Sequence, residues 1–243
     1  TFFATAFDFN SADFLAEFEM PLYKIASGDL KNIPLLKYIA QIGKPMILST
    51  GGGSIDDVKR AYDEVMPINQ QLCILQCTAA YPVEPKDMHL RVIETFRDTF
   101  PDIVIGLSDH ESGIDSALVA YMLGARVIEK PFTLNRAWRG TDHAFSLSPE
   151  GLRRMVRNLK RVRESLGEPV KKQLPFEEKP LYKMGKKLVA AKDLDEGSVI
   201  SREDIAIKSP GDGLPPYELE NLIGKTLVKE LKEDDNFSFD FIK

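Results

Sequence analysis

Long hydrophobic runs are missing from this sequence of 243 residues. A helix that crosses a bilayer needs about 20 consecutive apolar residues, and no stretch here approaches that length, so the sequence argues against a membrane protein. An excess of positive charge is missing too, because 32 lysines and arginines stand against 37 aspartates and glutamates and the net charge is −5. A general nucleic-acid binder carries the opposite balance, so we expect neither nucleic acid nor membrane as a partner.

Cysteine is scarce, and the two that are present, Cys73 and Cys77, lie in one apolar stretch, LCILQC. If that stretch is a strand, residues four apart share a face and lie about 13 Å from each other, which is too far for a disulfide bond. We expect two buried thiols, of which Cys77, nearer the strand end, has the better claim to line a site. Unpaired thiols indicate a reducing compartment, and we expect a cytoplasmic protein.

What the sequence does contain is a regular alternation of short apolar runs and amphipathic stretches. The apolar runs predict six strands, at 1–5, 20–26, 45–50, 72–77, 103–108 and 126–130. The amphipathic stretches predict helices near 11–18, 30–42, 54–66, 86–99, 114–123 and 148–166. Apolar strands that are each followed by a helix indicate a parallel sheet with right-handed crossovers.

Nearly every predicted strand ends in polar side chains. These ends are Thr5, Lys24 to Asp29, Ser49-Thr50, Thr78 to Tyr81, Ser108 to His110, and Glu129-Lys130. A doubly wound sheet gathers its active groups at one switch point, whereas every strand of a (β/α)8 barrel can contribute to the mouth. We therefore predict an α/β fold of the TIM-barrel type with six of its eight units present. Because Thr1 stands inside the apolar run TFFATAF, we expect two units to precede it.

Any one of these polar ends, taken alone, is typical of a turn or a helix cap. Together they are expected to place hydroxyls, two lysines and one imidazole on a single rim, as the binding of a small phosphorylated anion requires. The three glycines of STGGG, residues 51–53, are a possible anion cradle, although an ordinary flexible turn is the alternative. The loop NRAWRGTDH, residues 135–143, is interpreted as a substrate-recognition loop rather than a simple lid.

The composition of the sequence and its hydrophobic periodicity change at about residue 167. A stretch rich in proline and charge, residues 167–182, predicts a linker between a barrel domain at 1–166 and a small β-rich domain at 183–243. Turn residues at 195–197 and 210–213 separate the short strands of the small domain. The segments TLVKEL and NFSFDFI are predicted to be its closing pair of strands.

Five segments, in their order and spacing, resemble the sialic acid synthase family, which includes N-acetylneuraminate, legionaminate and pseudaminate synthases. They are YKIASGD, KPMILSTGG, QCTAAYP, FPDIVIGLSDH and GTDHAFSL. The tail, with DEGSVISREDIAIKSPGDG and LIGK, resembles the C-terminal antifreeze-like (SAF) domain of that family. The resemblance implies a (β/α)8 barrel with an appended SAF domain, in a homodimer where that domain swaps across to the partner's barrel mouth.

The resemblance also implies a reaction and a set of residues. The reaction is the condensation of phosphoenolpyruvate with an N-acylated hexose, such as N-acetylmannosamine, with release of phosphate and the help of Mn²⁺ or Mg²⁺. Catalytic roles fall on Lys24, Asp29, His110 and Asp142, where His110 matches a metal ligand and the two aspartates match carboxylates that contact the sugar. Binding of phosphoenolpyruvate falls on Lys24, Thr5, Ser27, Ser49, Tyr81 and Ser108.

The sequence departs from the family pattern in three places. Pro131 stands where the family has a second metal-binding histidine, and Ser209 stands where some members have an arginine. The motifs of the first two barrel strands are also absent, and because six strands leave two open edges, we expect the isolated chain to be inactive. Since a proline side chain cannot bind a metal, Pro131 favours an alternative reading, a non-catalytic member that binds a sugar or a protein partner.

Overall fold

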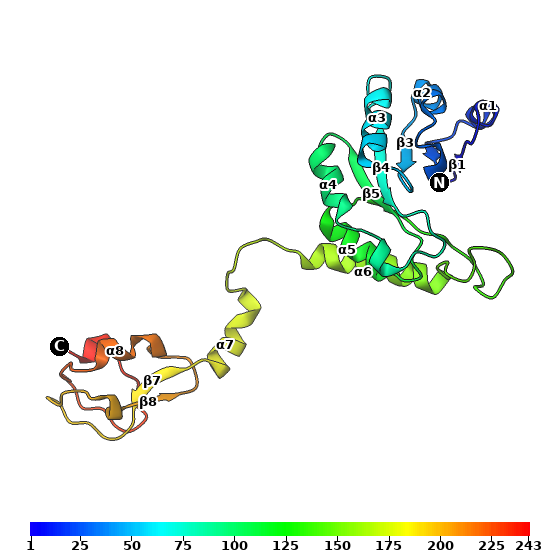
Figure 1. Ribbon diagram of the computed structural model, residues 1–243. Helices are drawn as coiled ribbons and strands as arrows, with labels where there is room; N and C mark the ends of the chain where they lie inside the picture. The colour runs from blue at the N-terminus through cyan, green and yellow to red at the C-terminus, as the bar shows by residue number, and fades with distance from the viewer. The chain divides into compact units, whose positions relative to one another are not determined.

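The computed structural model describes residues 1–243, which divide into a first unit, residues 1–167, and a second unit, residues 168–243. Strands and helices alternate along the first unit (Figure 1). Its strands are β1 (Ala4–Thr5), β2 (Tyr23–Ile25), β3 (Met46–Ser49), β4 (Leu72–Cys77), β5 (Val104–Ser108) and β6 (Val127–Glu129). Its helices are α1 (Phe9–Glu17), α2 (Ile33–Gln41), α3 (Ile55–Val65), α4 (Val92–Thr99), α5 (Asp115–Leu123) and α6 (Pro149–Ser165).

The six strands form one sheet in which every neighbouring pair is parallel and the spatial order follows the chain, β1 to β6. A parallel pair that is consecutive in the chain needs a crossover, and the intervening helices supply it. This confirms the predicted parallel β/α architecture. Beyond β6, a single parallel bridge joins Phe132 to Leu147.

The sheet is strongly curled. In a flat sheet, β2 and β6 would lie four strand spacings apart, about 19 Å, which is farther than a lysine and a glutamate side chain together can span. Nζ of Lys24 on β2 nevertheless lies 3.6 Å from a carboxylate oxygen of Glu129 on β6. The carboxyl ends of these two strands therefore face each other across the inside of a partial barrel, as the TIM-barrel prediction requires.

Local sequence signals account for several of the helix ends. The side chain of Ser54 accepts a hydrogen bond from the backbone N–H of Asp57 at the start of α3, and Ser148 caps α6 ahead of Pro149. Gly124 ends α5 in the left-handed region, with φ 109°. The helix predicted over 86–99 is wrong in its first half: a single 3₁₀ turn is followed by His89 at φ 45°, and α4 begins only at Val92.

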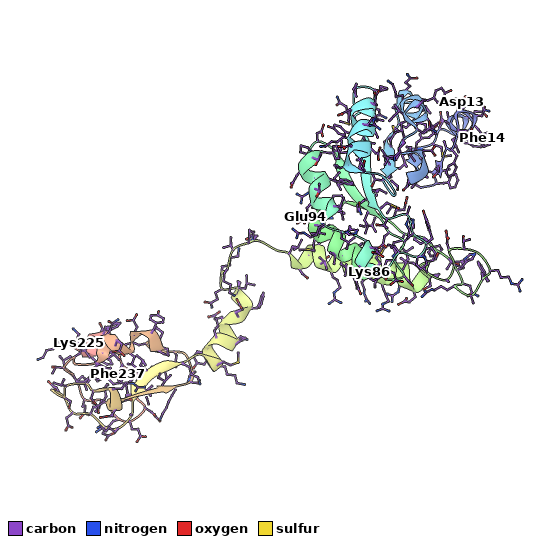
Figure 2. The ribbon with its side chains drawn as sticks, viewed as in Figure 1. Asp13, Phe14, Lys86, Glu94, Lys225 and Phe237 are labelled. Atoms are coloured by element: carbon purple, nitrogen blue, oxygen red, sulfur yellow. The ribbon has the colours of Figure 1, made fainter.

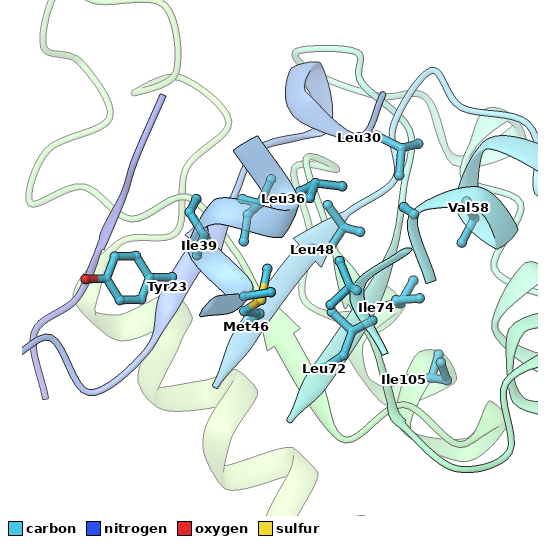
Figure 3. Packing of buried hydrophobic residues seen from close by; sticks show 14 of the residues in the cluster. Tyr23, Leu30, Leu36, Ile39, Met46, Leu48, Val58, Leu72, Ile74 and Ile105 are labelled. Carbon is cyan, nitrogen blue, oxygen red and sulfur yellow. The ribbon is translucent and has the colours of Figure 1, made fainter. Parts of the chain in front are cut away.

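The core of the first unit lies between the outer face of the sheet and the helices. Figure 3 shows this packing, in which Tyr23, Met46, Leu48 and Ile74 from the strands meet Ile39 and other helix side chains.

The outer edge of β1 pairs with no strand, and several nearby phenylalanines are exposed. They are Phe2, Phe7, Phe14 and Phe18, of which Figure 2 labels Phe14. No helix is long and apolar enough to cross a membrane.

The second unit has a core of its own. Strands β7 (Lys187–Ala190) and β8 (Ile205–Lys208) pair antiparallel, and the helices are α7 (Glu178–Met184) and α8 (Leu219–Leu222). Phe237, labelled in Figure 2, is among the buried side chains of this core. The two predicted closing segments do pair, through an antiparallel bridge between Leu227 and Ile242 and a hydrogen bond from the N–H of Val228 to the carbonyl of Phe241, but they form an isolated bridge and not an extended ladder.

Candidate active site

The carboxyl ends of all six strands present a polar or sulfur-bearing side chain to the inside of the curled sheet. Neighbours in register point to the same face, and so do residues two apart along a strand. The pairings Thr5–Lys24, Lys24–Ile47, Ser49–Leu75, Cys77–Ser108 and Ser108–Glu129 therefore place one set of side chains together. The set is Thr5, Lys24, Ser49, Cys77, Ser108 and Glu129.

Lys24 is the cation at the centre of this set. Its side chain is 10% exposed, and Nζ donates hydrogen bonds to Oγ of Ser49 at 2.7 Å and to the carbonyl of Ile25 at 3.0 Å. Oε2 of Glu129 lies 3.6 Å from Nζ, and Oε1 of Glu129 accepts a hydrogen bond from Oγ of Ser108 at 2.6 Å. Hydrogen bonds thus join β2 to β3 and β5 to β6, and the ion pair of Lys24 with Glu129 joins these two pairs into one polar cluster, whose positive charge is nearly enclosed.

The second lysine that the sequence placed on this rim, Lys130, is elsewhere, and that prediction is wrong. Its Nζ lies 3.1 Å from Oδ2 of Asp109 and donates to the carbonyl of Glu111. The side chains of Lys130 and Asp109 are 2% and 0% exposed, and Asp109 also accepts from Ser116 and from the backbone N–H of Glu111. Lys130 is therefore one half of a buried ion pair that joins the ends of β5 and β6.

The glycine loop after β3 offers little as an anion cradle. The N–H of Gly51 donates to Oγ of Ser27 at 2.9 Å, and the N–H of Gly53 donates to the carbonyl of Thr50 at 3.1 Å. The N–H of Ser54 is bonded to Asp57. Since a cradle needs free donors, the interpretation as a flexible turn with a tight approach to Ser27 fits better.

His110 follows β5 and contacts Cys77. Its Nδ1 lies 3.3 Å from the carbonyl of Thr78 and 3.9 Å from Sγ of Cys77. Both neighbours accept hydrogen bonds, so we assign the proton to Nδ1, which leaves the lone pair on Nε2. Burial lowers the pKa of His110, but the Cys77 sulfur and the Thr78 carbonyl raise it by more, and the net pKa is above its ordinary value.

The pKa of Cys77 is shifted in the opposite direction to that of His110. Burial raises the pKa of its thiol, and hydrogen bonds from His110 and Ser27 lower it by more, so the net pKa is below its ordinary value. Oγ of Ser27 lies 3.6 Å from this sulfur. Burial instead raises the pKa of Cys73 to about 12, and both cysteines are free, as the sequence predicted.

Tyr81 and Asp142 approach the same region from two loops. The ring of Tyr81 lies 4.3 Å from the His110 ring between centroids and 6.5 Å from Phe145. Burial raises the pKa of Tyr81, and so do the charges of Cys77, Asp142 and Glu129 around it. Asp142 itself is exposed, and its carbonyl accepts hydrogen bonds from Ser146.

Asp29 makes its side-chain hydrogen bond within its own turn. It ends a 3₁₀ turn, is half-buried, and accepts a hydrogen bond from the side chain of Asn32 at 3.0 Å.

Side-chain hydrogen bonds hold the loop at 135–143 in place. Arg136 donates to the Ala144 carbonyl and to Ser112, and His143 pairs with Thr133 at 2.7 Å. Its tip, with Trp138, faces solvent.

The side chains near His110 do not make up the two-histidine metal centre that the family resemblance implies. His110 suits a ligand role, because a carbonyl and a sulfur hold its Nδ1 side. Pro131 has no side-chain donor, and its carbonyl accepts the N–H of Leu147. No group of three or more histidine, cysteine, aspartate or glutamate side chains in the chain is arranged to hold a metal ion. The residues present therefore do not fit that centre.

Sequence reasoning placed Glu129 among the polar strand ends but gave it no role, and it gave Cys77 only a general claim to line a site. The signal for Glu129 was present, since it is the last residue of β6 and pairs in register with Ser108.

Comparison with known proteins agrees with this geometry. Residues 1–171 match the model of the NeuB family, and residues 187–243 match the SAF domain. The chain is 41% identical over 235 residues to N-acetylneuraminate-9-phosphate synthase of Homo sapiens, covering 96% of this chain and 66% of the relative, just under two thirds of its length. It is 35% identical to N,N'-diacetyllegionaminic acid synthase of Campylobacter jejuni, covering 96% and 71%.

A solved structure supports the same assignment. The crystal structure of spore coat polysaccharide biosynthesis protein SpsE from Bacillus subtilis superposes with a TM-score of 0.65 at 32% identity, over 98% of this chain and 72% of that one. The two relatives and the solved structure each cover at least 96% of this chain, so each aligns with both of its units. The chain belongs to the NeuB family and carries a SAF domain at its C-terminal end.

Proposed function

We propose that the protein condenses phosphoenolpyruvate with an N-acylated hexose, giving a nonulosonic (sialic-type) acid and inorganic phosphate. The observation that carries this proposal is the cluster of Lys24, Ser49, Ser108 and Glu129 at the carboxyl ends of four strands. Relatives at 41% and 35% identity are named as synthases of N-acetylneuraminate 9-phosphate and of N,N'-diacetyllegionaminic acid. We assign residues 1–166 to the synthase domain, 167–182 to the linker and 183–243 to the SAF domain.

Lys24 is proposed to bind phosphoenolpyruvate through one of its anionic groups. A buried ammonium attracts an anion more strongly than an exposed one, because water screens the charge less. Ser49 holds the ammonium in place, and Ser27, Ser108 and Tyr81 supply hydroxyl donors, with Thr5 beside Lys24 in the sheet. These groups fix the reactant with its methylene carbon toward the sugar, which lowers the entropic part of the barrier.

The chemistry balances without a redox partner. The methylene carbon of phosphoenolpyruvate attacks the aldehyde carbon of the open-chain sugar, a carbon–carbon bond forms, and the aldehyde oxygen takes up a proton. Water adds to the resulting cationic carbon and loses a proton. The hydroxyl of this tetrahedral intermediate then gives up its proton and becomes the ketone of the product, while the bond from the same carbon to the phosphate oxygen breaks and phosphate leaves with the proton. We assign sugar contacts to Asp29 and Asp142, and we place His110 beside the aldehyde.

We propose further that Mn²⁺ or Mg²⁺, if used, is held more weakly than by a two-histidine site, because only His110 supplies an imidazole at that position. When bound, such an ion would polarise the aldehyde oxygen. A homodimer with swapped SAF domains and a cytoplasmic location are part of the same proposal. They are supported by the family relationship and by the two free thiols.

The direct test is phosphate release from phosphoenolpyruvate in the presence of N-acetylmannosamine and Mn²⁺. Turnover is expected to depend on both substrates, EDTA is expected to reduce it, and Lys24→Met is expected to abolish it. Lys24→Met preserves side-chain volume and removes the charge, so unfolding can be checked separately by circular dichroism. Release that persists at full rate in Lys24→Met would contradict the assignment of the anion site.

Pro131 supports a second candidate function, a non-catalytic protein that binds a sugar or a protein partner through the same fold. That alternative predicts binding of an N-acylated hexose without consumption of phosphoenolpyruvate. Absence of phosphate release with every N-acetylated hexose tried, together with calorimetric binding of one of them, would favour it over the synthase.

A further inference from the structure

Glu129 uses the hydrogen-bond donors that the proposed anion site would need. A serine hydroxyl has one hydrogen to donate. Ser108 donates it to Oε1 of Glu129 at 2.6 Å, a short bond to a carboxylate. A substrate oxygen that took this hydrogen would have to replace Glu129 as the acceptor.

The same holds for Lys24. An ammonium has three hydrogens, and two of them go to Oγ of Ser49 at 2.7 Å and to the carbonyl of Ile25 at 3.0 Å. Both acceptors belong to the sheet itself. The nearest remaining anionic group is Oε2 of Glu129, at 3.6 Å from Nζ, a distance of an ion pair rather than of a good hydrogen bond. The third donor therefore faces Glu129 and is loosely held.

From these contacts we infer that Glu129 occupies the anion site of the ligand-free protein as an internal carboxylate, and that its displacement sets the affinity for phosphoenolpyruvate. The inference rests on the proposed function and deepens it. A carboxylate bound by Lys24 and Ser108 has the charge and the contacts of the substrate's own anionic group. Two anions cannot share one ammonium and one hydroxyl without mutual repulsion, so substrate binding moves Glu129 aside.

Differences in exposure show which partner moves. The side chain of Lys24 is 10% exposed and that of Glu129 is 37% exposed. Lys24 is fixed by two hydrogen bonds, one to Ser49 on the neighbouring strand β3 and one to the carbonyl of Ile25 on its own strand, whereas Glu129 is fixed by one, from Ser108. Glu129 therefore leaves toward solvent while the ammonium stays, and the donors of Lys24 and Ser108 pass to the ligand.

Removing the charge of Glu129 should consequently strengthen anion binding. Glu129→Gln keeps the shape of the side chain and an acceptor for Ser108, but it gives up the attraction to Lys24 and the repulsion of the ligand. We expect the Kd for phosphoenolpyruvate to fall about tenfold, which corresponds to about 1.4 kcal/mol. Glu129→Asp keeps the charge on a shorter side chain, and its Kd for phosphoenolpyruvate is expected to lie between those of the unmodified protein and Glu129→Gln.

The experiment is isothermal titration calorimetry of phosphoenolpyruvate into the protein, Glu129→Gln and a charge-matched control. The control is Glu94→Gln on α4, a partly exposed position that pairs with Arg91 at 2.9 Å and that Figure 2 labels. It removes the same unit of charge from the same unit of the protein, so it reports any change that follows from net charge alone. Circular dichroism confirms that all variants are folded.

The inference is supported if Glu129→Gln binds phosphoenolpyruvate more tightly than the unmodified protein does, while Glu94→Gln binds it with the same affinity as the unmodified protein. Equal or weaker binding by Glu129→Gln, when the unmodified protein binds phosphoenolpyruvate, overturns it and leaves the proposed function standing. Failure of all three proteins to bind phosphoenolpyruvate contradicts the proposed function, and the inference with it.

Discussion

At the scale of the residue, two lysines at the strand ends have opposite environments. Lys24 faces the inside of the curled sheet and keeps a loosely held donor, whereas Lys130 is enclosed with Asp109, and both side chains of that pair are almost fully buried. A buried charge that loses its partner pays a large desolvation cost, since nothing else compensates it. The Lys130–Asp109 pair is therefore expected to act on stability, while Lys24 is expected to act on binding.

Lys130→Met tests this division. The substitution leaves Asp109 buried without its counter-charge, and we expect it to lower the free energy of unfolding by about 3–5 kcal/mol. The measurement is urea denaturation followed by circular dichroism at pH 7. The double variant Lys130→Met, Asp109→Asn removes both charges and is expected to recover part of the loss. A single variant as stable as the unmodified protein would contradict the account of the pair.

Pro131→His tests whether position 131 takes part in metal binding. The substitution adds an imidazole two residues beyond Glu129, where the family resemblance places a second ligand beside His110. We expect the affinity for Mn²⁺ to rise by about 10-fold or more, in line with the effect of ligand-shell changes at metal sites. Titration of Mn²⁺ monitored by electron paramagnetic resonance measures it directly. Pro131→Ala removes the ring without adding a donor, and equal affinity in the two variants would show that position 131 is not used.

The residues of the site could be predicted in part from the sequence, and the error at Lys130 has a simple physical cause. Position at a strand end predicts that a side chain is near the rim, but the face it points to follows from the alternation along the strand. Ser108 and Glu129 pair in register and point inward, so the next residues, Asp109 and Lys130, point to the other side. Register between strands is a property of the folded sheet, which is why Glu129 was given no role and Lys130 was misplaced.

At the scale of the element, β5 and β6 approach each other closely at Gly106. A Cβ atom built there would lie 2.4 Å from the carbonyl oxygen of Val127 and 2.5 Å from Cδ2 of Leu75. The first of these atoms belongs to the backbone of the paired strand and cannot move without disturbing the ladder. Glycine at this position therefore permits the strand spacing that brings Ser108 to Glu129.

Gly106→Ala is expected to lower the free energy of unfolding by about 1–3 kcal/mol, the usual range for overpacking. The matched control is Gly28→Ala, because a Cβ at Gly28 would meet nothing within 4 Å. Thermal unfolding of both variants measures the difference. If Gly106→Ala and Gly28→Ala unfold at the same temperature, the close approach of β5 and β6 is not a constraint on the fold.

The elements themselves follow largely from local sequence. Apolar runs gave all six strands, and the caps at Ser54, Ser148 and Gly124 gave three helix ends. The helix predicted over 86–99 failed because His89 adopts a left-handed backbone conformation that periodicity of hydrophobic residues does not reveal. The closing segments of the second unit pair only through an isolated bridge, since β-like composition does not ensure an extended ladder.

At the scale of the whole molecule, the chain contains two separately packed cores. The boundary between the two units lies between Gly167 and Glu168. The first core comprises side chains from the curled sheet and its helices, and the second comprises Leu188, Ile205, Phe237 and others of the small β-rich unit. Units with separate cores are expected to unfold separately.

Differential scanning calorimetry is therefore expected to show two transitions, and Asp204→Asn is expected to move only one of them. A hydrogen bond from Lys192, with others from Ser201, lowers the pKa of Asp204 from 3.8 to about 2. Because the folded pKa is depressed, its stabilising contribution is present above about pH 4 and is lost as the pH falls toward 2. With allowance for solvent around the Lys192 side chain, it is about 1–2 kcal/mol.

Asp204→Asn should thus lower the transition of the second unit at pH 7 and leave it unchanged, relative to the unmodified protein, near pH 2. Gly106→Ala should lower only the transition of the first unit at either pH. This crossed pattern separates the two cores without cutting the chain, because each substitution reports on its own unit. One transition that both substitutions shift by the same amount would mean that the two cores unfold as a single cooperative unit, and the division of the molecule would have to be abandoned.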